Sequence, residues 1–257
     1  MPRFAVSDWR SSDTGPDEDR YYRSSSHSVG ALLAGYSTKN LRPSTAAVNE
    51  CVPLALVQTD AKARVFVCAS AIGFYGNRGD EILGEKSPIG RGFLPEVCSE
   101  WEDASRVAAE VGIRTVNIRI GLVLSASGGA LGKMLTPFRL GLGGRMGSGR
   151  QWMSWIHVDD IVGAIQHAIG TESLAGAVNL VAPNAVRNAE FTKTLASVLR
   201  RPAIFPVPEF ALRLAFGKQA AEEMLLASTR DQPGKLGASG YMFRFRELRA
   251  ALESLVE

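Results

Sequence analysis

The sequence predicts an α/β fold in which a parallel sheet is followed by a small α-rich C-terminal part. Two short apolar runs, 64–69 and 114–124, are typical of strands, and the amphipathic stretch 93–111 between them is typical of a helix. This order forms a βαβ unit, whose strands are parallel. After Pro183, helices and short connections take over. A chain of 257 residues, 46% of them hydrophobic, is long enough to bury a full core.

The amino-terminal part differs from the rest of the chain. Serines cluster, charges alternate in sign and large aliphatic side chains are few within residues 1–45. Because such a stretch buries too little apolar area to offset its ordering entropy, we expect it to be poorly ordered. A helix interrupted by Pro53 is predicted over 46–57. We therefore divide the chain into this segment, a sheet domain at 46–183 and a small C-terminal domain at 184–257.

The elements of the first βαβ unit follow from local patterns. The run 64–69 is apolar almost throughout, as in a strand buried on both faces, and Ser70 ends it. The helix 93–111 carries one apolar stripe and stops at Gly112. The second strand, 114–124, follows directly.

The remaining elements are predicted in the same way. The glycine-rich passage 141–149 lacks the Gly-Lys-Ser/Thr of a phosphate loop and indicates a flexible loop that needs positive φ. A helix over 157–169 carries two aspartates in its first turn, and 178–181 is a third strand. Asn188 is predicted to cap the next helix. The last helix has an apolar stripe at Phe245, Leu248, Leu252 and Leu255.

Composition excludes several classes of protein. The net charge is only +3, from 29 basic and 26 acidic residues, and it forms no basic block, so nucleic-acid binding is not expected. Cys51, Cys68 and Cys98 lie too far apart for a disulfide framework or a paired-cysteine zinc site. No apolar run reaches the roughly 20 residues of a membrane span, and a secretory signal is missing. We expect a protein of the cytoplasm or an organelle interior, not a secreted one.

The candidate chemistry lies in the segment 67–76. Ser70 follows a buried strand, and ligands bind at the carboxyl ends of parallel strands. Its hydroxyl either hydrogen-bonds a substrate oxygen there or merely terminates the strand. Metal catalysis is not expected, because the chain has three histidines and neither a His-Glu-x-x-His nor a Cys-x-x-Cys motif. The absence of a Gly-x-Ser-x-Gly elbow argues against an α/β-hydrolase.

Further motifs extend along the chain. They are Gly79-Asp80-Glu81, Phe93-Leu94, Val97-Cys98-x-x-Trp101-Glu102, Arg119 to Leu124, Gly128 to Gln151 and Trp155 to Asp160. With the segment 67–76, this set resembles the extended short-chain dehydrogenases/reductases, and more specifically their atypical epimerase-family branch of the 39U type. The part from Asn188 onward is similar to that branch's small C-terminal domain. The resemblance covers about residues 45–257.

The resemblance implies a Rossmann-like domain that binds NADP and an oxidoreductase or epimerase activity on an unidentified small molecule. It suggests Ser70 and Tyr75 as catalytic candidates, although an alignment shifted by one residue uses Ala71, and packing beneath the sheet also explains Tyr75. The cofactor-binding candidates are Ala69, Ser70, Leu94, Cys98, Arg119 and Gly121. The candidates for the substrate pocket are Phe138, Trp152 and Trp155, of which the two tryptophans also fit a lid on the core.

Two departures from the superfamily pattern bear on function. Alignment on Glu102 places Leu94 and Cys98 where the superfamily has Tyr-x-x-x-Lys, a loss that the branch shares. Neither side chain replaces that acid–base pair near neutral pH, and Cys98 is interpreted as a small apolar filler. Residues 1–45 also contain no Gly-x-x-Gly-x-x-Gly loop for the pyrophosphate, so the Rossmann-like sheet is expected to be curtailed at its amino-terminal side. The strand 64–69 would then expose an edge, unless the amino-terminal segment, a second copy or another partner covers it.

Several alternatives stay open at this point. Arg119 either contacts a phosphate or ribose or, as we favour, pairs with a helix carboxylate. His157 is expected to cap or pack rather than to catalyse. Two functions fit the sequence: an NADP-dependent oxidoreductase or nucleoside-diphosphate-sugar-epimerase-like enzyme, and a catalytically inert relative that serves as a nucleotide-sensing or protein-binding scaffold.

Overall fold

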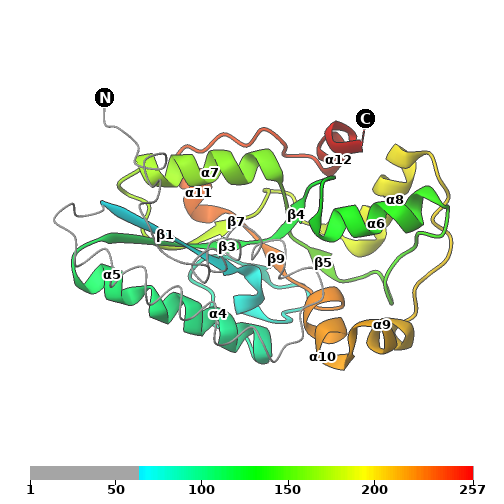
Figure 1. The fold of residues 1–257 in the computed structure, drawn as a ribbon, viewed down its shortest axis with the longest axis horizontal. Coiled ribbons are helices and arrows are strands. Elements are labelled where there is room, and N and C mark those ends of the chain that lie inside the picture. Colours follow the sequence, from blue (N-terminus) through cyan, green and yellow to red (C-terminus); the bar gives the residue numbers. More distant parts are fainter. Residues whose placement is uncertain (1–63, 257) are drawn as a thin grey trace, which may run out of the picture.

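A computed structural model describes residues 64–256 (Figure 1). The predictions for residues 1–45, for the helix at 46–57 and for Cys51 lie outside the described residues. Within residues 64–256, no helix is both long and apolar enough to cross a bilayer.

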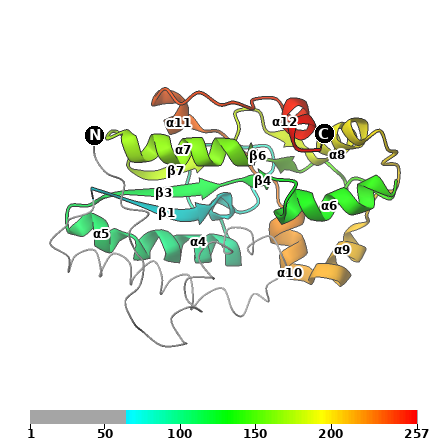
Figure 2. The same cartoon turned by 45° about the horizontal axis from the view of Figure 1, so that its top comes forward.

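A three-stranded parallel sheet lies at the centre of the described part. It consists of β1 (Val65–Ala71), β3 (Arg114–Ile120) and β7 (Gly176–Leu180), in the order β1-β3-β7. Helices α4 (Phe93–Ala104) and α5 (Arg106–Glu110) lie on one face, and α7 (Val158–Gly170) lies on the other (Figures 1 and 2). This layering confirms the predicted α/β class. Among the described strands, β1 is the outer one of this sheet, so what covers its edge stays a prediction.

One face of the sheet is apolar and packs against α7, whereas the alternate residues of β3, on the opposite face, are Thr115, Asn117 and Arg119. Val116, Ile118, Val178 and Leu180 are buried in one cluster with small residues of α7 (Val158–Gly170). Ala164 and Ala168 let that helix approach the strands closely, because they carry only a methyl group.

The predicted strand 114–124 is interrupted at Gly121. The pairing of β3 with β7 ends at Ile120. The chain continues as β4 (Leu122–Leu124), which pairs with β6 (Trp155–His157). A side chain on Gly121 would lie 2.6 Å from the carbonyl oxygen of Ser154, so the crossing of these two segments requires glycine.

The predicted end of the first strand is also wrong. β1 continues to Ala71, so Ser70 lies within the strand and is not the residue that terminates it. A short 3₁₀ helix, η2 (Ile72–Tyr75), follows directly and turns the chain back over the carboxyl end of the sheet.

A second core joins α6 (Gly129–Arg139), α8 (Asn188–Leu199) and α12 (Leu248–Val256). The predicted capping role of Asn188 is wrong: the cap position of α8 is Arg187, and the side-chain Oδ1 of Asn188 accepts the backbone N–H of Met146, a loop residue, at 2.8 Å. Phe245 packs against this core but precedes the helix to which the sequence assigned it.

Short elements complete the described part. They are β2 (Ile82–Leu83), β5 (Trp152–Met153), β8 (Val186–Arg187), α9 (Glu209–Phe216), α10 (Lys218–Ala220), the π-helix η3 (Ala221–Leu225), β9 (Arg230–Asp231) and α11 (Gly234–Ala238). β2 pairs with β9, and β5 pairs with β8. Segments on both sides of the predicted boundary at 183 are therefore paired, and that boundary stays a prediction.

The glycine-rich passage 141–149 serves two purposes. Gly141, Gly147 and Gly149 have positive φ, which confirms the predicted backbone requirement. Gly144 serves close packing instead, because a side chain there would lie 1.6 Å from the carbonyl oxygen of Phe205.

Candidate functional site

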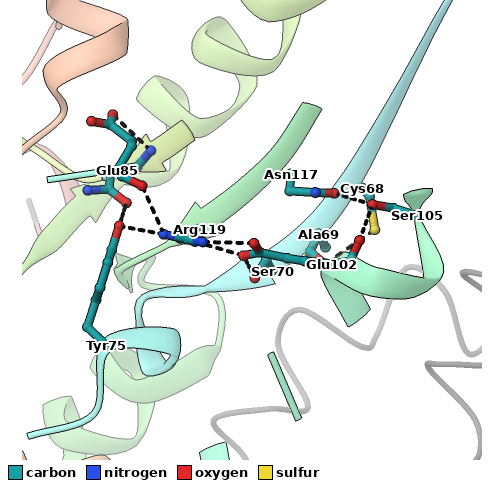
Figure 3. Close-up of polar contacts among 10 residues, drawn as sticks. Cys68, Ala69, Ser70, Tyr75, Glu85, Glu102, Ser105, Asn117 and Arg119 are labelled. Carbon is teal, nitrogen blue, oxygen red and sulfur yellow. Dashed lines mark hydrogen bonds and ion pairs between the residues drawn. The ribbon is translucent and has the colours of Figure 1, made fainter. Parts of the chain in front are cut away.

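Three buried polar residues stand side by side across the central sheet. Ser70 of β1 is in register with Arg119 of β3, which is in register with Asn179 of β7. All three lie near the carboxyl ends of their strands, where ligands bind in open α/β sheets. The row therefore marks the candidate site (Figure 3).

Arg119 is held by a carboxylate of the neighbouring helix. Its Nε and Nη2 donate to the two oxygens of Glu102 on α4 at 2.7 and 2.8 Å, and the Ser70 hydroxyl donates to Glu102 Oε1 at 2.8 Å. Burial lowers the pKa of Arg119, but the bonds to Glu102 and Tyr75 outweigh it and raise this pKa above its ordinary value. The favoured interpretation of Arg119, pairing with a helix carboxylate, is confirmed.

The Tyr75 hydroxyl hydrogen-bonds the third nitrogen of the same guanidinium, Nη1. It accepts from Arg119 Nη1 at 2.9 Å and donates to Asn179 Oδ1 at 2.7 Å (Figure 3). Burial raises the pKa of this fully buried phenol. The guanidinium carbon also lies 3.5 Å from the ring centroid of Phe74. Tyr75 thus binds within the network, as the packing interpretation expects, and its role in catalysis stays a prediction.

The network extends to the C-terminal part through Glu85. One oxygen of its carboxylate accepts the backbone N–H groups of Asn179, at 3.3 Å, and of Lys235, at 3.0 Å. The side-chain amide of Asn179 donates to the carbonyl of Gln232 at 3.0 Å. These bonds fix the segment after β9 against the end of the sheet.

Leu94 and Cys98, which the sequence alignment predicts at the superfamily's Tyr and Lys positions, face η2. A side chain on Gly73 would lie 3.3 Å from Leu94 Cβ and 3.6 Å from Cys98 Sγ. Burial raises the pKa of the Cys98 thiol to about 12, so the thiol stays protonated at neutral pH. Cys98 packs as a small apolar residue, which confirms its interpretation as a filler.

The amino terminus of α4 binds a carboxylate from a distant part of the chain. Glu223, in the π-helix η3, accepts the backbone N–H groups of Phe93 at 3.2 Å and of Leu94 at 2.8 Å. It thereby caps a helix whose own preceding residue, Gly92, has no side chain to do so. Sequence reasoning missed Glu223, because no local signal links it to a helix 130 residues away.

A second unpredicted group is the buried carboxylate of Asp231. Within residues 64–256 neither of its oxygens has a hydrogen-bond partner. The Ser154 hydroxyl accepts the backbone N–H of Asp231 and donates to the carbonyl of Thr229. Burial raises the pKa of Asp231 to about 7, so near neutral pH the group is held partly in its acid form.

The three residues predicted around the substrate pocket do not lie together: two are in the core, and one is at the surface. Phe138 and Trp155 are buried in the core formed by α6, α8 and α12, as the core interpretation of Trp155 expects. Their contact with a substrate stays a prediction. Trp152 lies at the surface of β5, half-buried, with its Nε1 donating to Asp80 at 2.9 Å. A large apolar side chain does not by itself indicate which of the three residues is buried in the core and which lies at the surface.

The remaining predicted residues have structural contacts. Ala69 is a half-buried residue of β1. His157 caps α7 through Nδ1, which accepts the backbone N–H of Asp159 at 3.1 Å, and its ring stacks on Phe245. Its predicted capping role is confirmed. In the part of the chain that the structure describes, no group of three or more His, Cys, Asp or Glu side chains could hold a metal ion.

Comparisons with known proteins agree with this architecture. Residues 207–255 match the domain of unknown function DUF1731. The chain is 41% identical over 219 residues to an epimerase family protein of Mycobacterium bovis, covering 85% of this chain and 72% of that protein. The crystal structure of human epimerase family protein SDR39U1 (isoform2) with NADPH superposes with a TM-score of 0.83 at 33% identity, covering 88% and 78% of the two chains. A nucleoside-diphosphate sugar epimerase from Corynebacterium glutamicum gives a TM-score of 0.71 at 33% identity, covering 90% of this chain and 43% of that one.

Proposed function

Because the chain belongs to the epimerase family of SDR39U1 and its homologues, we propose that it binds NADP and catalyses an oxidoreductase or epimerase reaction on a small molecule. The observation that carries the proposal is the row of Ser70, Arg119 and Asn179 at the carboxyl ends of three parallel strands. The relative crystallised with NADPH shares this fold over most of the chain, which supports NADP as the cofactor.

The end of β1 and the start of η2 fit the nicotinamide half of NADP. Ala71, Ile72 and Gly73 are half-buried, and none carries a charged or bulky polar side chain, so a flat apolar ring can lie against them. Leu94 and Cys98 offer no cation or acid to the nicotinamide ribose. When bound, NADP would supply the hydride donor or acceptor.

Ser70 and Tyr75 are the proposed proton-transfer residues. Both hydroxyls hydrogen-bond within the buried network in this structure. To act on a substrate, either hydroxyl must exchange one of these partners for a substrate oxygen. The Glu102–Arg119 pair would then serve to hold them in place.

A second candidate function is a scaffold that binds nucleotide or protein without turnover. One observation favours it: Leu94 and Cys98 pack on Gly73 at the positions where the superfamily holds its acid–base pair. The two functions differ in turnover, whereas a nucleotide-sensing scaffold also binds NADPH.

Titration of the full chain with NADPH tests the proposal. We expect saturable enhancement of nicotinamide fluorescence and a rise in melting temperature that grows with NADPH concentration, because the ligand binds only the folded state. NADH serves as the matched control for the extra phosphate. A cooperatively folded sample that shows neither response would overturn NADP binding. Saturable binding without any change of bound NADPH in the presence of a broad set of carbonyl compounds would favour the scaffold.

A further inference from the structure

A hollow of about 230 Å³ lies between α8 and the segment 203–206 that follows it. Figure 1 shows α8 near one end of the molecule, away from β1. None of the eight residues that line the hollow belongs to the row of Ser70, Arg119 and Asn179 or to the network around it. The hollow is therefore separate from the candidate site.

Small side chains keep this hollow open. Ala189 and Ala196 stand two turns apart on one face of α8, and Ala203, in the following segment, contributes a third methyl group to the lining. Because a methyl group fills little volume, the helix and the segment leave space between them. Ile204, which also lines the hollow, is 71% exposed, so apolar surface is open to a ligand there.

Two cations line the hollow without an acidic partner. The Nη1 of Arg145 donates to the carbonyl of Ser148 at 2.6 Å. A side chain on Gly149 would lie 3.2 Å from Arg145 Cδ and 3.1 Å from Ala189 Cβ, which places Arg145 beside the first turn of α8, one turn before Lys193. Lys193 makes no hydrogen bond or ion pair with another residue of 64–256, and no lining residue is acidic. The hollow therefore carries an excess of positive charge.

A buried hydroxyl also lacks a partner in this lining. Thr192 is only 4% exposed, and within residues 64–256 its Oγ1 forms no hydrogen bond. An unsatisfied buried hydroxyl is costly, so the group is suited to bind an oxygen that enters the hollow. A threonine in a helix adopts either of two χ1 rotamers, which allows its hydroxyl to turn toward a ligand.

We infer that this hollow binds a small aliphatic carboxylate, whose head meets Arg145 and Lys193 and whose tail lies against the alanines and Ile204. A guanidinium presents planar N–H donors that match a carboxylate. Five of the eight lining residues are alanine, isoleucine or proline, so inorganic phosphate would leave oxygens unpaired against apolar walls. Pockets for drug-sized ligands have about 300–1,000 Å³, which indicates a smaller molecule here. This site is additional to the proposed function and does not depend on NADP.

Hexanoate is the probe that tests this site. The full chain is titrated with hexanoate by isothermal titration calorimetry, with acetate and hexylammonium in parallel. We expect saturable binding of hexanoate, and at least about tenfold weaker binding of acetate, which lacks the tail, and of hexylammonium, whose charge is reversed. Lys193→Gln should weaken hexanoate binding about tenfold, because it removes a hydrogen bond between charged groups. Lys193→Arg keeps the charge and should retain most of the affinity.

A second variant tests the hollow itself. Ala189→Leu should abolish hexanoate binding, because the larger side chain fills the space. Its melting temperature should stay the same, since Ala189 is exposed and leucine is a good helix former. The matched controls are Ala250→Leu, at an exposed alanine of α12, and Lys133→Gln, at an exposed lysine of α6. Neither residue lines the hollow, so both variants should bind hexanoate as the unmodified chain does.

The inference is wrong if hexanoate shows no saturable binding, or if Lys193→Gln or Ala189→Leu binds it as tightly as the unmodified chain does. Acetate or hexylammonium binding as tightly as hexanoate would also overturn it. Titration of Lys193→Gln with NADPH separates this site from the proposed function. Unchanged NADPH affinity is expected, whereas a loss that matches the loss of hexanoate binding would assign the hollow to the cofactor and overturn the inference.

Discussion

Arg119 and Glu102 join the central sheet to α4 through two parallel hydrogen bonds, at 2.7 and 2.8 Å. Their side chains are only 5% and 13% exposed, so each charge depends on the other for its neutralisation. The Ser70 hydroxyl binds the carboxylate and the Tyr75 hydroxyl binds the guanidinium. The pair therefore links both candidate proton-transfer residues, and the network depends on it.

Glu102→Gln should destabilise the protein by about 3 kcal/mol, because it leaves the buried Arg119 charge without its partner. Urea unfolding followed by far-UV circular dichroism measures the change in free energy of unfolding. Asp103→Asn is the control: it breaks the exposed pair with Arg106, whose side chains are 51% and 73% exposed, and should cost less than about 1 kcal/mol. Equal effects of the two variants would contradict a structural role for the buried pair.

Tyr75→Phe separates the two interpretations of this phenol. Removing the hydroxyl leaves Asn179 Oδ1 and one Arg119 N–H without a partner, so we expect a loss of about 1–3 kcal/mol in unfolding free energy. NADPH affinity should be unchanged, because the fully buried ring has no surface to offer to a cofactor. Phe74→Leu, which keeps both hydrogen bonds, is the control. Unchanged stability together with a lost enzymatic activity would instead establish Tyr75 as the catalytic acid.

Glu223→Ala should loosen the start of α4. The variant removes the acceptor of two backbone N–H groups and the negative charge at a helix amino terminus, at a cost of about 1–2 kcal/mol. Hydrogen exchange of the Phe93 and Leu94 amides should become faster, which a general loss of stability elsewhere would not single out. Glu223→Gln keeps one acceptor oxygen and should show a smaller effect. Glu222→Gln, which breaks only an exposed pair with Arg213, should leave both amides as slow as before.

The parts of the fold that could be predicted are those that local pattern determines. The apolar runs of β1, β3 and β7, the stripe of α4 and the glycines with positive φ all follow from short-range rules. Errors arose where a distant segment decides the outcome. The strand predicted over 114–124 breaks at Gly121 because Ser154 crosses there, and Asn188 binds Met146 instead of capping its helix.

In the candidate site, too, residues determined by local pattern were predictable, and those brought in by distant segments were not. Arg119 was correctly expected to pair with a helix carboxylate, since an arginine in an apolar strand requires a buried partner. Glu223 and Asp231 were missed because both reach the site from the C-terminal part, more than 100 residues beyond the strand end that suggested it. The burial of Phe138 and Trp155, in contrast to Trp152, depends on how α6 and α8 pack, which a single sequence does not reveal.

Asp231 should make the stability of this protein depend on pH. Its pKa is about 7 in the folded state and near 3.8 when unperturbed, so between these values the folded state binds the proton more tightly. Its contribution to stability is therefore present at low pH and lost as pH rises from about 4 to about 7, with a slope of up to about 1.4 kcal/mol per pH unit. Asp231→Asn stays neutral, so it should be more stable than the unmodified chain above pH of about 7, with the difference shrinking toward acid pH. Urea unfolding of both proteins across this range measures that difference, and the exposed Asp103→Asn should show no such trend. Parallel stability curves for Asp231→Asn and the unmodified chain would mean that the Asp231 carboxylate finds a partner when it is charged.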